Sequence, residues 1–198
     1  DFGSMPNDGG HLSDISADEA EAIRKKDPVA AKYLHRLIGS RELIHNDERY
    51  CLWLDGANPA DLRTSPELTL RVEKVRKLRI ESKRAATQKL AKKPSEFGEN
   101  RQPKVKYIAV PSVSSDKREY VPMAVLEPDV IANNLVLIVP MKSLATFGFL
   151  QSKVFALWNK AVSGRLGNGM RISVSITYNN FVSPMLNKEQ RANIERDA

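Results

Sequence analysis

The pattern of apolar and polar positions is most regular between residues 65 and 93, where apolar side chains recur at three- and four-residue steps. This period places them on one face of a helix, so the pattern predicts one long helix over residues 65–93 with that face against a core. The apolar face consists of Leu68, Val72, Val75, Leu78, Ala85, Ala86 and Leu90. The opposite face carries Arg and Lys and is expected to face solvent.

The chain before this helix contains two shorter helical patterns. Ser16 and Glu19 form a capping box, which predicts a helix that ends near residue 26. Asp27 and Pro28 are typical of an N-cap and a first helical position, which predicts a second helix ending near Gly39. Residues 40–45 are expected to add a short turn.

The C-terminal half contains two more helical patterns. Apolar side chains gather on one side of residues 143–162, which predicts a second long helix that Gly164 ends. The polar segment after Pro184 predicts the start of a last helix. We expect this helix, residues 187–198, to be truncated by the end of the sequence.

Short apolar runs predict strands in three places. Residues 50–54 are typical of a buried strand, and the single cysteine, Cys51, is expected there as a small core residue. Residues 106–112 and 119–126 predict the strands of a hairpin whose polar, basic tip is residues 113–118. Residues 135–139 predict a third strand.

Strict alternation of apolar and polar side chains predicts one more strand at residues 170–178. Together these patterns predict an α+β fold, with an antiparallel or mixed sheet, packed helices and one long basic helix. Residues 1–15 have no regular pattern and are expected to be a linker from an upstream domain, so residues 16–186 form the main domain.

The positive charge is concentrated in the predicted basic helix. Residues 65–93 carry ten Lys/Arg against three Glu, a surplus of seven that equals the formal net charge of the whole chain. A cationic element attracts polyanions, and nucleic acid is the polyanion that a basic chain most often meets. No apolar run reaches the roughly 20 residues of a membrane span, and the start lacks a secretory signal. A soluble cytoplasmic protein without a membrane partner is therefore expected.

The sequence contains no convincing catalytic or metal-binding motif. The three histidines, His11, His35 and His45, are scattered, and there is no second cysteine for a zinc site. The glycines at 164–169 follow a predicted helix and precede a strand, which is the reverse of a phosphate-binding loop. Asp61, Glu81 and Lys83 have the spacing of a magnesium-dependent nuclease, but the last two fall within the helical pattern. We predict no catalytic, metal or cofactor site in this chain.

Side chains suited to reading base pairs gather in three loops next to predicted strand ends. Arg and Lys can bond guanine, Asn can bond adenine, and Ser serves either base. Loops on a rigid scaffold are common recognition sites, although the same residues also make ordinary turns and solvated surfaces. The loop residues are Ser114, Ser115, Lys117 and Arg118 in the first loop, Asn133 and Asn134 in the second, and Arg165, Asn168 and Arg171 in the third.

The order of segments resembles the target-recognition domain of the MmeI-like restriction-modification enzymes. These type II proteins fuse an endonuclease, an adenine-N6 DNA methyltransferase and a shared recognition domain. The most specific motifs are RYCLWL at 49–54, RQP at 101–103 and YNNF at 178–181. The family usually continues the last motif with Pro-Trp-Pro, whereas this chain has Val-Ser-Pro. The resemblance extends from Phe2 to the start of the last helix.

The resemblance implies that the chain recognises a short double-stranded DNA site and positions its adenine for a methyltransferase domain elsewhere in the parent chain. It places the specificity-varying segments near the tip after Pro111, at the turn 131–135 and between 165 and 173, the same three loops. S-adenosylmethionine and Mg²⁺ are implied for the parent enzyme, with the methyltransferase and endonuclease domains as partners. The predicted base contacts are Ser114, Ser115, Lys117, Asn133, Asn134, Asn168, Met170 and Arg171. The predicted phosphate contacts are Arg76, Lys77, Lys83, Arg84, Arg118 and Arg165.

Three other hypotheses fit the sequence. An RNA-binding accessory domain would need exposed aromatic strands, which the pattern does not indicate. A small enzyme would need the catalytic residues that the motifs lack. A structural module whose basic helix docks on an acidic partner domain could coexist with DNA recognition.

Overall fold

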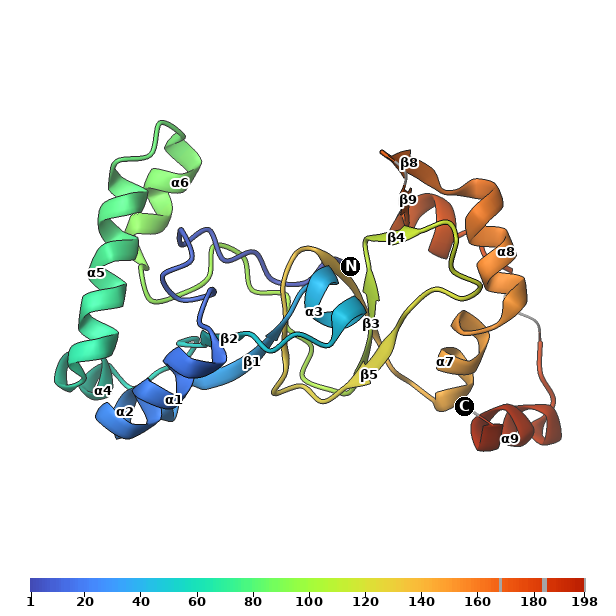
Figure 1. Cartoon of the computed structure of the whole chain (residues 1–198), viewed down its shortest axis with the longest axis horizontal. Coiled ribbons are helices and arrows are strands. Elements are labelled where there is room, and N and C mark those ends of the chain that lie inside the picture. The colour runs from blue at the N-terminus through green and yellow to red at the C-terminus, as the bar shows by residue number, and fades with distance from the viewer. Residues whose placement is uncertain (168, 183–184, 198) are drawn as a thin grey trace.

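The computed structural model describes residues 1–167, 169–182 and 185–197, which form an elongated α+β molecule (Figure 1). Helices α1, α2, α4, α5 and α6 gather at one end and α7, α8 and α9 at the other, with strands β3 and β5 between them (Figure 1). The described strands form three sheets of three strands each. The sheet that contains β1 is mixed, and the other two are antiparallel. The predicted fold class is therefore confirmed.

The N-terminal end begins as the capping pattern predicts. Helix α1 (Ala17–Lys26) starts at Ser16, whose hydroxyl accepts a hydrogen bond from the Glu19 backbone. Helix α2 (Pro28–Ala31) starts at Asp27, but it ends after four residues, so the prediction that it continues to Gly39 is wrong. Residues Leu34–Ile38 instead form strand β1.

Long-range pairing explains why this segment is a strand. Strand β1 pairs antiparallel with β2 (Tyr50–Leu52) and parallel with β6 (Ile131–Ala132). The backbone groups of β2 and β6 form hydrogen bonds with the backbone groups of β1. A helix here would leave β2 and β6 without this partner. Helix α3 (Ser40–His45) occupies the position of the expected short turn.

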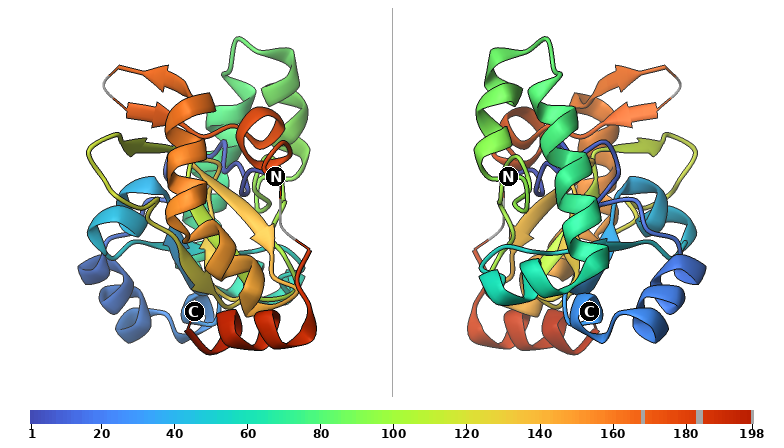
Figure 2. Two further views of the ribbon diagram at one scale, coloured as in Figure 1. Left: turned by 90° about the vertical axis from the view of Figure 1, so that its right-hand side faces the viewer. Right: turned by 90° about the vertical axis from the view of Figure 1, so that its left-hand side faces the viewer.

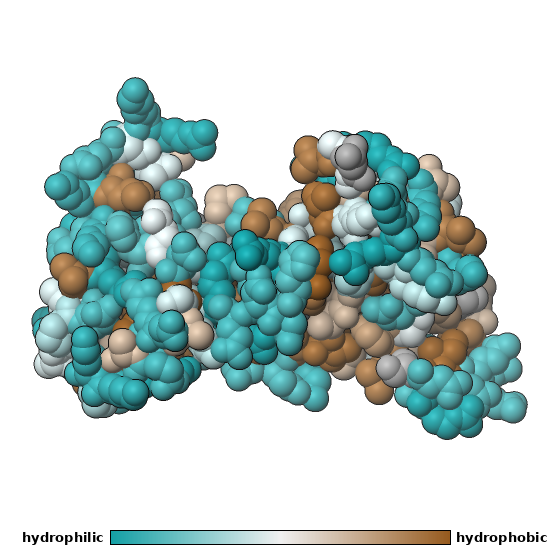
Figure 3. Space-filling view, in the orientation of Figure 1, coloured by the Kyte–Doolittle hydropathy of each residue, from teal (hydrophilic) through white to brown (hydrophobic). Residues whose placement is uncertain are grey.

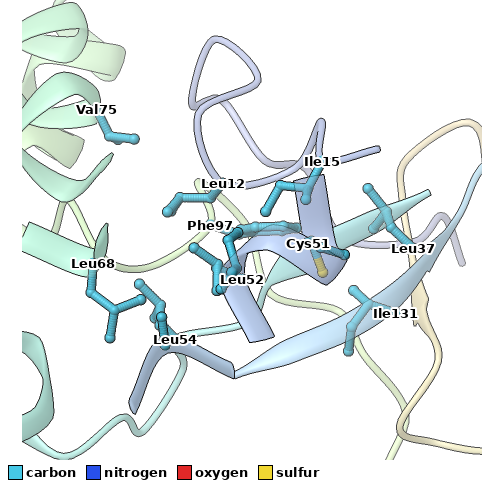
Figure 4. Close-up of a cluster of buried hydrophobic side chains, with 13 residues drawn as sticks. Leu12, Ile15, Leu37, Cys51, Leu52, Leu54, Leu68, Val75, Phe97 and Ile131 are labelled. Carbon is cyan, nitrogen blue, oxygen red and sulfur yellow. The ribbon is translucent and has the colours of Figure 1, made fainter. Parts of the chain in front are cut away.

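The first core cluster joins β1 and β2 to the helices (Figure 4). Cys51 is fully buried in it, as predicted, and burial raises the pKa of its thiol. Leu12 and Ile15 of the opening segment are also fully buried in this cluster. The assignment of residues 1–15 as a linker to an upstream domain stays a prediction, but the segment is packed into this fold.

The predicted long basic helix is interrupted. Helix α4 (Pro59–Thr64) precedes α5 (Pro66–Ile80), and a turn separates α5 from α6 (Ala85–Lys89) and the 3₁₀ turn η1 (Leu90–Lys92). Leu68 and Val75 face the core as expected, whereas Ala85 and Ala86 are exposed. The turn brings η1 back beside α5, where the buried side chain of Arg79 bonds the Leu90 carbonyl.

The central sheet has the strand order β5-β3-β7, from β5 (Ala124–Leu126), β3 (Tyr107–Pro111) and β7 (Val136–Pro140). The predicted antiparallel pairing is confirmed for residues 107–109 with 124–126, where Ile108 lies opposite Val125. The predicted strand 119–126 begins only at Ala124, and residues 113–115 of the predicted tip form a strand of another sheet. Ile108 and Val110 pack toward α7 and α8, while Tyr107 and Ala109 pack toward β6 and α3. Both faces of β3 are therefore covered, and all of its residues are buried.

The C-terminal end differs from the prediction in two places. The expected helix 143–162 is divided into α7 (Leu144–Leu150) and α8 (Lys153–Val162), because the Ser152 side chain accepts a hydrogen bond from Phe155 and starts a new helix. The expected strand 170–178 stops after β9 (Gly169–Arg171). Residues Val174–Tyr178 form the π-helical turn η2, which Ser173 caps.

The chain ends in helix α9 (Lys188–Asp197), as the polar pattern after Pro184 predicts. Figure 2 shows α7 and α8 lying across the central sheet at one end of the molecule and α5 at the other. Within the described ranges, no helix is both long enough and apolar enough to cross a membrane.

Candidate nucleic-acid interface

Two of the three predicted recognition loops form one small sheet. Strand β4 (Val113–Ser115) pairs antiparallel with β9, and β9 pairs antiparallel with β8 (Gly164–Leu166) in a hairpin. The register puts Val113 opposite Arg171 and Ser115 opposite Gly169. Segments about 50 residues apart in the sequence are therefore neighbours, through pairing that no local pattern indicates.

The second loop joins this sheet through one residue, Ser112. Its backbone N–H donates to the carbonyl of Leu135 at 3.1 Å, and its carbonyl accepts a hydrogen bond from the Ile172 backbone at 2.9 Å. The turn that carries Asn133 and Asn134 is thus tied to both other loops. All three loops converge on a single corner of the fold.

Many of the polar and charged side chains in these loops face solvent. Ser115, Lys117, Arg118 and Arg171 are exposed, and Asn134 is half-buried. Arg165 is also exposed, and its guanidinium pairs with the Asp116 carboxylate at 3.1 Å. This ion pair links the first and third loops across the small sheet.

Three of the predicted base contacts have buried side chains instead. Ser114 and Met170 are each 3% exposed, because they pair with each other in the sheet and point inward between half-buried and exposed neighbours. Asn133 is 5% exposed, and its side-chain oxygen accepts a hydrogen bond from the Leu135 backbone at 2.9 Å. These side chains shape their loops, and they would reach a base only if the loops rearranged. Asn168 lies outside the described residues.

Gln102 anchors the approach to the second loop, a role that sequence reasoning missed. Its side-chain amide donates to the carbonyls of Pro128 at 3.0 Å and Val130 at 2.8 Å, and its oxygen accepts a hydrogen bond from the Ala132 backbone at 3.0 Å. The RQP motif singled out this glutamine, but only the tertiary structure gives it partners. Tyr107 adds a hydroxyl bond to Val130 at 2.6 Å, and burial raises the pKa of Tyr107 to about 12.

The opening segment also supports the second loop. The backbone of Ser4 donates to the Ala132 carbonyl at 2.8 Å. A Cβ added to Gly3 would lie 2.3 Å from the backbone oxygen of Asn133, so only glycine allows this approach. The second loop is therefore held from two sides.

A second cationic region lies at the turn between α5 and α6. Lys83 and Arg84 are exposed there, and neither forms a salt bridge within the part of the chain that the structure describes. Arg76 pairs with Glu73 at 3.5 Å and Lys77 with Glu81 at 3.9 Å, both on the exposed helix surface. Exposed pairs of this kind are worth little energy and exchange partners readily.

The two cationic regions project toward the same side of the molecule. We call the β8–β9 hairpin the ribbon prong and the turn at residues 81–84, with the adjoining helix ends, the helical prong. Both point upward in Figure 1, at opposite ends of the long axis, and both views of Figure 2 agree. Figure 3 shows the surface hollowed between them.

The residues considered for catalysis do not come together. Asp61 lies in α4, where it accepts a hydrogen bond from the Tyr33 hydroxyl at 2.9 Å, while Glu81 and Lys83 lie beyond the other end of α5. His35 contacts the Asp129 carbonyl at 2.8 Å. Among the described residues, no group of three or more His, Cys, Asp or Glu is placed to hold a metal ion.

Comparison with known proteins identifies the family. Residues 1–185 match the family described as "MmeI, target recognition domain". The chain belongs to the MmeI target recognition domain family. It is 36% identical over 194 residues to a protein named DNA methyltransferase A from Bacillus subtilis (strain 168), an alignment that covers 98% of this chain and 22% of that protein.

A solved structure has the same fold. It is a type IIL restriction-modification enzyme, MmeI, in complex with DNA, with a TM-score of 0.92 and 32% sequence identity, covering 98% of this chain and 26% of that one. The target recognition domain thus spans about a quarter or less of each relative. The resemblance seen in the sequence motifs is confirmed.

Proposed function

We propose that this target recognition domain binds a short double-stranded DNA sequence, with the duplex seated in the hollow between the two prongs. The observation that carries the proposal is the convergence of the three polar loops at one corner, on the side to which the helical prong also projects. A two-stranded ribbon fits the major groove, where each base pair has a distinct pattern of donors and acceptors. The solved relative, which was determined with DNA, supports this assignment.

The exposure of the side chains divides their proposed roles. The half-buried Asn134 and the exposed residues of the small sheet and its turn are proposed to contact base edges, and these are Ser115, Lys117 and Arg171. Six other exposed cations are proposed to contact phosphates, and these are Arg76, Lys77, Lys83, Arg84, Arg118 and Arg165. Ser114, Asn133 and Met170 are proposed to act from the interior as supports.

The parent protein is proposed to be a cytoplasmic restriction-modification methyltransferase with further domains. We propose that residues 16–186 deliver a target adenine to a methyltransferase domain, and that residues 1–15 and 187–198 connect to the rest of that chain. N6 transfer from S-adenosylmethionine and Mg²⁺-dependent cleavage by an endonuclease domain complete the proposal. Nucleotide sequencing that detects N6-methyladenine in DNA exposed to the full-length protein tests this part.

A selection experiment tests sequence recognition directly. The full-length protein is incubated with duplexes that contain a randomised centre, and the retained sequences are read. A single enriched motif is expected, with affinity that falls steeply as salt rises because neutralised phosphates release counterions. Equal retention of all duplexes, or stronger retention of single-stranded RNA than of duplex DNA, would contradict the proposal.

Arg171→Ala sharpens this test. If Arg171 makes a bidentate base contact, its loss should cost ~1–3 kcal/mol of binding and relax the motif at one base pair. Arg63→Ala is the matched control, because Arg63 is an exposed arginine on α4 at the opposite side of the molecule (Figure 1). A uniform loss on every duplex would make Arg171 a phosphate contact instead.

A further inference from the structure

One buried polar network holds both ends of the ribbon prong. Ser163 directly precedes β8, and Ser173 follows β9 after one intervening residue. The Thr177 hydroxyl lies 3.1 Å from the Ser163 hydroxyl and accepts a hydrogen bond from the Ser173 backbone at 3.2 Å. Thr177 has no solvent exposure, so one interior hydroxyl connects Ser163 and Ser173, the residues that flank the hairpin at its two ends.

Asn159 sets the direction of the hydrogen bonds in this network. The Asn159 side-chain oxygen accepts a hydrogen bond from the Ser163 hydroxyl, so the Ser163 proton is already used. The Thr177 hydroxyl must then donate to the Ser163 oxygen while it accepts from Ser173. With the Asn159 side chain in this orientation, each hydroxyl has one donor and one acceptor, and the buried Asn159 amide nitrogen has no partner among the described residues.

Thr177 is itself held at its backbone. Its carbonyl accepts a hydrogen bond from the Trp158 indole N–H at 2.8 Å, from helix α8. The Ser173 hydroxyl accepts a bond from the Ile176 backbone at 3.3 Å and starts the turn that carries Thr177. The hydroxyl of Thr177 is therefore fixed relative to α8, and so are the groups it bonds.

The ribbon has few other supports. Its strands are three residues long, and it is joined to the rest of the fold by the pairing of β9 with β4 and by the exposed ion pair of Arg165 with Asp116. A Cβ added to Gly164 or Gly167 would meet no described atom within 4 Å, so these positions of the hairpin stand clear of neighbouring atoms. The direction of so short a hairpin therefore depends on the hydrogen bonds at its two ends, Ser163 and Ser173.

We propose that Thr177 is a positioning residue that aims the ribbon prong at the DNA, acting through Ser163 and Ser173. This inference rests on the proposed function, because it assumes that the ribbon reads base pairs. Specific contacts need side chains held within a fraction of an ångström, whereas phosphate contacts tolerate more movement. Loss of the hydroxyl should therefore reduce sequence preference more than general DNA affinity.

The test compares Thr177→Val with Thr177→Ser in the full-length protein. Valine keeps the shape of threonine and removes the hydroxyl, whereas serine keeps the hydroxyl. For Thr177→Val we expect preference for the selected duplex over the randomised duplex pool to fall about tenfold, because a lost interior hydrogen bond is worth about that factor. Affinity for the pool and its salt dependence should change by less than about twofold. Thr177→Ser should restore most of the preference.

Ser163→Ala provides a second route if Thr177→Val folds poorly, since it removes the other hydroxyl of the same bridge. Amide hydrogen exchange at Arg165 and Arg171 should accelerate in both variants while exchange in the central strand β3 stays unchanged. Unaltered preference in folded Thr177→Val and Ser163→Ala proteins, or equal losses in the valine and serine variants, would overturn the inference. If the wild-type protein selects no motif, the proposed function fails instead.

Discussion

Arg79 shows how one side chain of a basic segment can have an interior role. It is fully buried on α5, and its five N–H donors all bond backbone carbonyl oxygens. These carbonyls belong to Pro6, Asn7, Leu90, Lys93 and Glu96. Arg79 therefore joins the opening segment, the end of α5 and the chain after η1, and it does not add to the cationic surface.

Replacing Arg79 should be costly. Arg79→Met removes five hydrogen bonds to carbonyl groups, of which those of Pro6, Leu90 and Lys93 keep a backbone donor. We expect the free energy of unfolding to fall by about 3–5 kcal/mol. Urea denaturation of the purified protein measures this change. Arg76→Met, an exposed arginine on the same helix, should change stability by less than about 0.5 kcal/mol. Equal effects of the two variants would contradict the interior role of Arg79.

Arg71 is a second arginine of the basic segment whose side chain joins separate parts of the fold. Its guanidinium pairs with Glu67 at 2.6 Å and with Glu19, and it donates to the His11 carbonyl at 2.7 Å. It links α5 to α1 and to the opening segment. Arg79 follows Val75 by four residues and so lies on the apolar face of α5, but the sequence pattern does not show which distant carbonyl groups its guanidinium will meet.

At the scale of elements, Asp27 couples the starts of two helices. One oxygen of its buried carboxylate accepts a hydrogen bond from the Ala30 backbone at 3.0 Å and caps α2. The other accepts from the Ser65 hydroxyl at 2.6 Å, while Ser65 caps α5 through the Leu68 backbone. The sequence predicted the first cap but not the contact between the two.

These contacts predict an acid-sensitive contribution to stability. Burial alone would raise the pKa of Asp27, but hydrogen bonds from Ser65, Ala30 and Glu67 outweigh burial and hold the pKa below its usual value. Because the pKa is lower in the folded state, the stabilisation is complete above the unfolded pKa of about 3.9 and is lost as the pH falls through the folded pKa.

Asp27→Asn tests this contribution. We expect it to lower the free energy of unfolding by about 1–3 kcal/mol at neutral pH, with the difference from wild type shrinking below about pH 4. Urea denaturation across this pH range provides the measurement. Asp129→Asn is the control, since Asp129 is exposed and its carboxylate accepts no hydrogen bond among the described residues. A pH-independent difference for Asp27→Asn would show that its charge is not involved.

At the scale of the whole molecule, we propose that the two prongs make different kinds of contact with DNA. The ribbon prong is joined to the loops that carry the proposed base contacts, whereas the helical prong presents Lys83 and Arg84 from a different core cluster. The two ends of the molecule are connected through the central sheet. A duplex that spans both prongs would have its base edges contacted at the ribbon prong and its phosphates contacted at the helical prong.

The double variant Lys83→Ala with Arg84→Ala tests this division. Binding should weaken by a similar factor for all duplexes, the selected motif should not change, and the slope of log affinity against log salt should become shallower by up to about 2. Lys25→Ala with Lys26→Ala removes the same charge from exposed positions on α1, at the lower side of Figure 1, and should leave the slope unchanged. A changed motif in the Lys83 and Arg84 variant would place base contacts on the helical prong.

Helix caps and strands could be predicted from the sequence where neighbouring residues decide the local structure. Ser16 and Asp27 cap helices where their spacing predicts helix starts, the run around Cys51 is a buried strand, and residues 107–109 pair with 124–126. The family motifs and the polar chemistry of the three loops were also visible. Each of these features depends on residues a few positions apart or on two strands that are close in the sequence.

The tertiary structure alone decided the remaining features. Residues Leu34–Ile38 became a strand because β2 and β6 lie beside them, and residues Val174–Tyr178 became a turn because Thr177 and Trp158 meet there. The convergence of three loops on Ser112 and the burial of Arg79 depend on contacts between distant segments. Hydrogen bonds to partners far along the chain outweigh local preference, and no pattern of neighbouring residues encodes which distant partner will be present.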